Sequence, residues 1–350
     1  MRKVIKHKIK GKVGHWIKEF LTNRKFKVIA NGTMSESEDV MSGVPQETVL
    51  AAILFIIMIS DIDENVKACI VRCFADDTRV SKKIQDEEDK SKMQEDLCSI
   101  YKWAEDNAMK FNDTKFEQLN YGILNNVPIE PYKNPSNEDI ASSTIVKDLG
   151  VVTNSNLTFK EHIDSIITSS RITSGMILRT FTTRDTKVMI QLFKTYIRIK
   201  LEYCCSVWSP VQQGVINEIE RVQKSYSSKI EGMEGLDYHQ RLVKLNVYSL
   251  ERRRERYLVI YAWQMIEGIK ENILELRSKK YGRSRTIWSP VTPWSHKGIK
   301  IKHSMRTKIH NNSAKKMERL FNALPSKIRN ITEKSTDTLS LSQISAELII

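Results

Sequence analysis

The chain has 350 residues, 40% of them hydrophobic and 28% charged, so it can bury a core and is not a disordered polypeptide. Its formal net charge is +14, and residues 251–350 carry 21 Lys and Arg against 9 Asp and Glu. This basic segment suits a polyanionic partner such as nucleic acid, although a solvated lysine-rich surface explains it equally well. The longest apolar run, Val49–Ile59, is too short for a transmembrane helix, and five cysteines without paired CxxC motifs favour reduced thiols of an intracellular protein.

The chain opens with a helix and a hairpin pattern. Apolar residues at three- and four-residue spacing predict a helix over Val13–Leu21. Phe26–Ala30 has the composition of a strand and ends at Asn31-Gly32, a strong hairpin signal. The acidic stretch Ser35–Val40 could form the return strand.

A glycine–proline corner at Gly43–Gln46 separates this hairpin from the apolar run. With Thr48 near its start and no breaker inside it, the run Val49–Ile59 is predicted to be a buried helix. Residues 66–84 are expected to form a β-hairpin around an acidic turn, and residues 86–107 an amphipathic helix.

After residue 110 the sequence pattern changes from short extended segments to helices. Residues 110–121 are expected to be short and extended, and the stretch 125–143, rich in Asn, Pro and Ser, to be a loop or hairpin tip. Lys147–Val152 indicates a strand and turn. Helices are predicted near Ile163–Ile167 and over Val188–Ile197, Val215–Ile230 and Ser249–Ile269. Residues 277–315 show no clear periodicity, and the last twenty residues look loosely ordered.

Two adjacent aspartates, Asp76 and Asp77, lie between the short strands predicted for residues 66–84. From such a turn both carboxylates can converge on divalent cations. Two Mg²⁺ ions roughly 3.5–4 Å apart can then hold a nucleoside triphosphate and an attacking 3′-hydroxyl in line. Asp-Asp is also common in turns for conformational reasons alone, so the pair by itself does not decide between the two interpretations.

Further short motifs follow one another along nearly the whole chain. In chain order these segments are Gly43–Gln46, Phe74–Asp77, Trp103–Asn112, Lys115, Lys147–Gly150, Phe159–Ile163, Lys200–Tyr203, Trp208–Pro210, Ile219–Lys224, Arg241-Leu242, Ser249–Arg253 and Phe321–Pro325. This order resembles that of reverse transcriptases from non-LTR retrotransposons, with jockey-type mobile elements the nearest kind. The resemblance implies an α+β fold, in which a polymerase palm with an antiparallel sheet is followed by an α-helical thumb and a basic C-terminal extension.

The resemblance also implies roles for residues around the acidic turn. Asp76 and Asp77 match the two catalytic, metal-binding aspartates of the family, and Phe74 matches the aromatic residue that packs beneath the primer end. Gln46 matches the segment that lines the pocket for the incoming nucleotide and template base. Lys115 aligns with the lysine proposed to protonate the pyrophosphate leaving group.

The family pattern divides the chain into a partial palm at 1–120, a primer-grip-like hairpin at 121–155, a helical thumb at 156–270 and a basic extension at 271–350. Lys147–Val151 would be the turn that grips the primer, and the thumb helices would follow the minor groove of the template–primer duplex. The implied activity is RNA-directed DNA polymerisation with two Mg²⁺ ions, an RNA template and a DNA primer.

Two features depart from the family pattern. In the family, the third metal-binding carboxylate and the fingers region precede the helix that opens this chain, and Asp61 and Asp63 come too late in the motif order to replace that carboxylate. We therefore expect the chain as given to be weakly active or inactive. Glu47 stands where the family usually has glycine, which permits close approach to a base pair. A non-catalytic nucleic-acid-binding remnant and a fragment without a role stay open as alternatives.

Four arginines outside the acidic turn are further candidates for nucleic-acid contacts. Arg252, Arg253, Arg254 and Arg256 fall within a predicted helix, where residues three to four apart share a face and could bind phosphates. A solvated helix surface explains them about as well.

Overall fold

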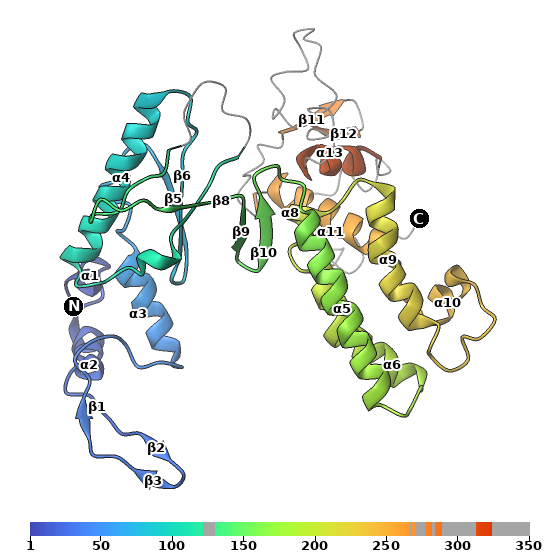
Figure 1. Ribbon diagram of the computed structural model, residues 1–350, viewed down its shortest axis with the longest axis horizontal. Helices are drawn as coiled ribbons and strands as arrows, with labels where there is room; N and C mark the ends of the chain where they lie inside the picture. Colours follow the sequence, from blue (N-terminus) through green and yellow to red (C-terminus); the bar gives the residue numbers. More distant parts are fainter. Residues whose placement is uncertain (122–129, 267, 270–276, 282–283, 289–312, 324–350) are drawn as a thin grey trace. The chain divides into compact units, whose positions relative to one another are not determined.

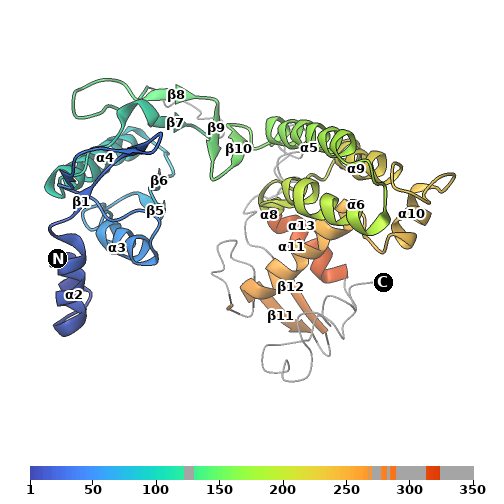
Figure 2. The ribbon, with the colours of Figure 1, turned by 90° about the horizontal axis from the view of Figure 1, so that it is seen from below.

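The computed structural model describes residues 1–121, 130–266, 268–269, 277–281, 284–288 and 313–323. The chain divides into two compact units, so that residues 1–118 and 123–143 form unit 1, and residues 119–122 and 144–350 form unit 2. The chain is α+β, with many helices and small two-stranded sheets, as predicted (Figures 1 and 2). No helix in the described ranges is long and apolar enough to cross a membrane.

Unit 1 begins with two helices and a long hairpin. Its elements up to the acidic turn are α1 (Arg2–Lys6), α2 (Gly11–Leu21), β1 (Lys25–Phe26), β2 (Ile29–Ala30), β3 (Thr33–Met34), β4 (Glu38–Asp39) and α3 (Val49–Ile59). Asn31 and Gly32 have φ angles of 50° and 80°, which a type I′ hairpin turn requires, so the predicted turn is confirmed. The return strand is split, because β3 pairs with β2 and β4 pairs with β1.

The apolar helix α3 forms where it was predicted. The Thr48 hydroxyl caps it by accepting a hydrogen bond from the Ala51 N–H at 3.1 Å. The prediction that α3 is buried is wrong for the described residues, since only Ala51 and Leu54 are buried and Val49 is 84% exposed. The reason is that one stripe of the helix packs on α1 and α2, and a helix that is apolar all round needs neighbours on every side to be buried.

The rest of unit 1 is built around one long helix. Its elements are β5 (Ile70–Phe74), β6 (Asp77–Ser81), α4 (Glu87–Asp106), the 3₁₀ helix η1 (Asp113–Lys115), β7 (Glu117–Leu119) and β8 (Ala141–Ser143). The predicted hairpin and amphipathic helix are both confirmed. Asp86 caps α4 by accepting from the Asp89 N–H, and Ile100 and Trp103 on the apolar stripe of α4 pack against Val71 of the hairpin. Of the predicted loop 125–143, the part before residue 130 lies outside the described residues.

Unit 2 starts with a hairpin and continues as helices. Its elements are β9 (Ile145–Asp148), β10 (Val151–Asn154), α5 (Lys160–Thr180), α6 (Thr186–Leu192), the π-helix η2 (Phe193–Arg198), α7 (Ile199–Glu202), α8 (Cys205–Trp208), α9 (Gln213–Ser227), α10 (Tyr238–Lys244), α11 (Leu250–Ile266), β11 (Arg277–Tyr281), β12 (Ser284–Trp288) and α13 (Ser313–Ala323). The helices predicted beyond residue 155 are thereby confirmed. The β11–β12 hairpin and the start of α13 fall in the stretch 277–315, where the sequence showed no periodicity. The last twenty residues lie outside the described part of the chain.

The core of unit 2 lies between α5, α6–α7, α8 and α9, and α5, α6 and α9 lie side by side in both views (Figures 1 and 2). Ile197, Leu201 and Ile219 are completely buried in this core, and Tyr226 is almost so. The Tyr226 hydroxyl donates to the Met189 carbonyl at 3.0 Å, which satisfies its polar end. A second apolar cluster joins α11 to α13.

Candidate functional site

The Asp76-Asp77 pair lies at the tip of the β5–β6 hairpin. Strand pairing runs from Ile70 opposite Ser81 to Phe74 opposite Asp77, so Ala75 and Asp76 form the two-residue turn. Both carboxylates are exposed, and neither forms a hydrogen bond or ion pair with any residue of the described ranges. The side chains of the chain's described part therefore do not compete with a cation for these oxygens.

The hairpin has one buried face and one exposed face. Val71 lies opposite Val80, and both contribute to the core formed with Ile100 and Trp103 of α4. The alternation of a β-strand directs Phe74 to the other face, where it is 68% exposed beside its cross-strand partner Asp77. The sequence thus places an exposed aromatic ring and the second aspartate of the pair on the same side of the hairpin.

Asp96 of α4 fixes the chain just before β5. This carboxylate is 3% exposed and accepts three backbone N–H groups, from Lys67 at 2.9 Å and from Ala68 and Cys69 at 2.8 Å. Burial raises the pKa of Asp96, but the three N–H donors together outweigh it and hold the pKa below its usual value. The sequence did not predict a role for Asp96, and its only sign of burial is that this charged residue falls within the apolar stripe of α4.

Asp61, two residues after the end of α3, accepts hydrogen bonds from two side chains of unit 1. Its Oδ1 accepts from the Lys3 ammonium at 2.5 Å and from the Trp103 indole N–H at 2.8 Å. The same ammonium lies 4.6 Å from the centre of the Trp103 ring. Asp61 therefore links α1 to α4.

The other residues predicted around the turn are exposed. Gln46 lies in the corner before α3, and Lys115 lies at the end of η1. No hydrogen bond or ion pair within the described ranges links either of them to Asp76 or Asp77. Glu47 has a φ of 59°, a left-handed conformation in which glycine is the least strained residue.

The predicted primer-grip turn forms a β-hairpin in unit 2. Strands β9 and β10 pair from Ile145 opposite Asn154 to Asp148 opposite Val151, and the turn residues Leu149 and Gly150 have φ angles of 45° and 83°. The Tyr203 hydroxyl donates to the Leu149 carbonyl at 2.9 Å. A side chain at Gly150 would stand 3.4 Å from the Tyr203 ring, so Tyr203 closes over the turn.

The His162 side chain of α5 accepts a hydrogen bond from the backbone of β10. It is 3% exposed, and its Nδ1 accepts from the Val152 N–H at 3.3 Å, so its Nε2 carries the proton and has no hydrogen-bond partner in the described part of the chain. Burial lowers the pKa of His162. Its ring meets the Trp208 ring edge-on at 5.4 Å, which joins the hairpin to the core of unit 2.

The four candidate arginines of α11 do not share one exposed surface. Successive residues of a helix point about 100° apart, so Arg252, Arg253 and Arg254 face three directions. Arg253 pairs with Glu202 of α7 through Nε and, at 3.0 Å, through Nη2. Arg254 is 1% exposed, so its guanidinium does not lie on the helix surface where a contact with a duplex phosphate was predicted, which corrects the prediction for this residue. Arg252 and Arg256 are half-buried, and their proposed phosphate contacts stay a prediction.

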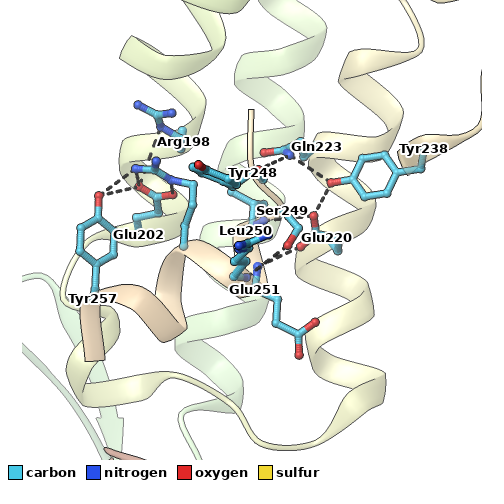
Figure 3. A network of polar contacts seen from close by, with 12 residues as sticks. Arg198, Glu202, Glu220, Gln223, Tyr238, Tyr248, Ser249, Leu250, Glu251 and Tyr257 are labelled. Carbon is cyan, nitrogen blue, oxygen red and sulfur yellow. Dashed lines mark hydrogen bonds and ion pairs between the residues drawn. The ribbon is translucent and has the colours of Figure 1, made fainter. Parts of the chain in front are cut away.

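A network of polar contacts anchors α11 on α7 and α9 (Figure 3). The Glu220 carboxylate accepts the Leu250 and Glu251 N–H groups at 3.1 and 3.2 Å, and also accepts the Tyr238 hydroxyl. A carboxylate in this place satisfies the free donors at the N-terminus of α11 and complements the helix dipole. The opposite side of the network is the Arg253–Glu202 pair, which Tyr257 extends by accepting from Arg253 at 2.8 Å.

Parts of the chain are similar to known proteins. The family model described as reverse transcriptase (RNA-dependent DNA polymerase) matches residues 1–153. The chain is 23% identical over 226 residues to the probable RNA-directed DNA polymerase from transposon X-element of Drosophila melanogaster. It is 28% and 25% identical over 229 residues to the RNA-directed DNA polymerases from mobile element jockey of Drosophila funebris and Drosophila melanogaster.

Each of these three alignments covers 62% of this chain and 25% of the relative, so the matched part of the chain spans about a quarter of the relatives' length. No solved structure matches the chain. The family match covers the hairpin that carries Asp76 and Asp77, together with α3 and α4 that flank it. Residues 1–153 therefore match the reverse transcriptase family, in agreement with the resemblance in the order of motifs.

Proposed function

We propose that the chain is part of an RNA-directed DNA polymerase of a non-LTR retrotransposon, in which Asp76 and Asp77 bind the catalytic metal ions. The observation that supports this is two adjacent carboxylates at the tip of a hairpin, which form no hydrogen bond or ion pair with the described residues and lie inside the segment matched by the reverse transcriptase family. Since the alignments cover about a quarter of the polymerase relatives, we propose weak activity for this chain by itself.

The donor atoms of the turn suit Mg²⁺, which prefers carboxylate oxygens and is often bound by one or two of them together with substrate phosphates. Asp76 and Asp77 would hold the ions, which when bound stabilise the negative charge of the phosphoryl group being transferred. Among the described residues, no three His, Cys, Asp or Glu side chains are grouped closely enough to hold a metal ion. Two carboxylates alone would bind Mg²⁺ weakly, which is consistent with the weak polymerase activity that we propose.

The surroundings of the turn suit a primer end. Phe74 presents an exposed ring on the face of the hairpin that carries Asp77, where it could pack beneath the last primer nucleotide. We propose that Gln46 lines the pocket for the incoming nucleotide and that Lys115 protonates the leaving pyrophosphate. The β9–β10 turn, which Tyr203 rigidifies, would contact the primer backbone, and Arg252 and Arg256 would contact phosphates of the RNA–DNA duplex.

Metal binding provides the most direct test. Mn²⁺, a paramagnetic substitute for Mg²⁺, should broaden the amide resonances of residues 74–78 in the full chain. Asp76→Asn and Asp77→Asn should each weaken this effect at least about tenfold, the scale of one lost charged ligand. Asp63→Asn is the matched control, because Asp63 is an exposed acid that precedes the same hairpin. Equal broadening in wild type and Asp76→Asn would refute the proposed metal site.

Nucleotide incorporation on an RNA template with a DNA primer tests the reaction itself. We expect a low rate that Asp76→Asn abolishes and Asp63→Asn leaves unchanged. A chain that binds the RNA–DNA duplex in a salt-dependent manner, but incorporates nothing and is indifferent to Asp76→Asn, would instead be a non-catalytic nucleic-acid-binding remnant.

A further inference from the structure

Arg254 is a buried cation whose terminal nitrogens have no hydrogen-bonding partner among the described residues. It lies on α11, is 1% exposed, and neither Nη1 nor Nη2 has an acceptor within that part of the chain. Guanidinium groups stay protonated in proteins, so a positive charge is enclosed here. A buried charge is usually stable only when it is paired and hydrogen-bonded, so this arrangement indicates that a partner is absent.

A second buried cation lies on α13, which packs against α11. Lys316 of α13 is 6% exposed, and its Nζ donates to the Ser209 hydroxyl at 3.1 Å and to the Pro210 carbonyl at 3.0 Å. An ammonium has three donors, so one remains free. Burial lowers the pKa of Lys316, the charges of Glu255 and Glu251 act against this from a distance, and the charge of Arg254 lowers the pKa further. Within the described part of the chain, no carboxylate lies within ion-pair distance of either cation.

Of the acidic side chains that act on Arg254 from a distance, two are engaged elsewhere. Burial lowers the pKa of Arg254, and the charges of Glu220, Glu251 and Glu202 act against this from a distance. Glu202 pairs with Arg253, and Glu220 caps the first turn of α11. The region where α8, α11 and α13 meet therefore holds two positive charges that the surrounding carboxylates balance only at long range.

We propose that Arg254, Lys316 and Ser209 form a binding site for a dianion of the phosphate class. The donors come from three segments, and together they offer the fork of the guanidinium, one ammonium proton and the Ser209 hydroxyl. A tetrahedral oxyanion accepts bonds from several directions, whereas a carboxylate accepts in one plane. A phosphate monoester carries a charge close to −2 at neutral pH, which matches the two cations.

The site is closed, so the anion enters when α13 moves away from α8 and α11, and once bound it joins these three segments. This inference does not depend on the proposed polymerase function, because none of its residues belongs to the Asp76-Asp77 turn. The phosphate could come from free inorganic phosphate or from a nucleotide, and both sources present the same oxygens.

Thermal unfolding of the full chain in phosphate and in chloride, at equal pH and ionic strength, tests the proposal. Phosphate should raise the Tm of the wild-type chain well above its value in chloride. Arg254→Met and Lys316→Met should abolish this difference. Arg221→Met is the control, because Arg221 is an exposed arginine of the same unit, and it should respond as the wild type does. In chloride, Arg254→Met should unfold at the same or a higher temperature, since it removes an uncompensated buried charge.

A second measurement needs no variant. Phosphate at about ten times its Kd should slow hydrogen exchange of the α13 amides about tenfold in the wild-type chain, because only the closed state binds it. A nucleoside 5′-monophosphate that acts at lower concentration identifies a nucleotide as the source, and an effect of inorganic phosphate alone identifies the free ion. Equal Tm values in phosphate and chloride, unchanged exchange, or a full phosphate response in Arg254→Met would each overturn the proposal.

Discussion

The hairpin that carries Asp76 and Asp77 depends on a residue twenty positions downstream of the turn, Asp96. Replacing Asp96 with Ala removes the acceptor of three backbone N–H groups, two of which belong to the half-buried residues Ala68 and Cys69. Hydrogen bonds to a charged acceptor contribute roughly 1.5–3 kcal/mol each, and they are not additive within one cluster. We therefore expect Asp96→Ala to lower the stability of the hairpin by about 3 kcal/mol in total for the three bonds, one of which is largely exposed.

Native-state hydrogen exchange measures this loss where it occurs. A cost of about 3 kcal/mol corresponds to a roughly hundredfold faster exchange of the β5 and β6 amides. Asp96→Asn keeps one acceptor oxygen and should lose about half as much. Glu95→Ala is the matched control, because Glu95 is the exposed neighbour on α4 and its replacement should change the stability by less than about 0.5 kcal/mol. If Asp96→Ala and Glu95→Ala gave the same exchange rates, the carboxylate would not hold the hairpin and our reasoning would be wrong.

Three further predictions follow from single contacts. Glu220→Ala should destabilise unit 2 by about 2 kcal/mol in urea unfolding, because α11 loses the acceptor of its first N–H groups, whereas Glu218→Ala on the same helix should have little effect. The stability of unit 2 should fall as the pH drops below 6.5, since His162 is buried with a lowered pKa and only the unfolded chain takes up the proton; His162→Gln, which does not titrate, should flatten this part of the pH profile. Glu47→Gly should raise the stability of unit 1 by about 0.5–1 kcal/mol, because the left-handed backbone at this position strains every residue except glycine, and an unchanged or lower Tm would contradict this.

The sequence by itself determined the local elements and the family resemblance. The hairpin turn at Asn31-Gly32, the hairpin around the two aspartates, the Thr48 cap of α3 and the helices of unit 2 depend on nearby residues, so short-range patterns predict them. The sequence placed the second turn at Asp76-Asp77, one residue later than the structure does. The resemblance to reverse transcriptases follows from the order of the motifs, which is read from the sequence alone. The β11–β12 hairpin is the exception, because its basic composition lacks the alternation by which strands are recognised.

Only the tertiary structure decided which polar side chains are committed to the fold. Asp96 and Glu220 are not distinguishable in sequence from exposed acids, yet each accepts backbone donors that lie about thirty residues away. The same holds for the arginines of α11, because their spacing defines their directions around the helix but not what packs against each one. Burial depends on the neighbours of an element, which also explains why α3 has an exposed apolar face and Arg254 lies in the interior.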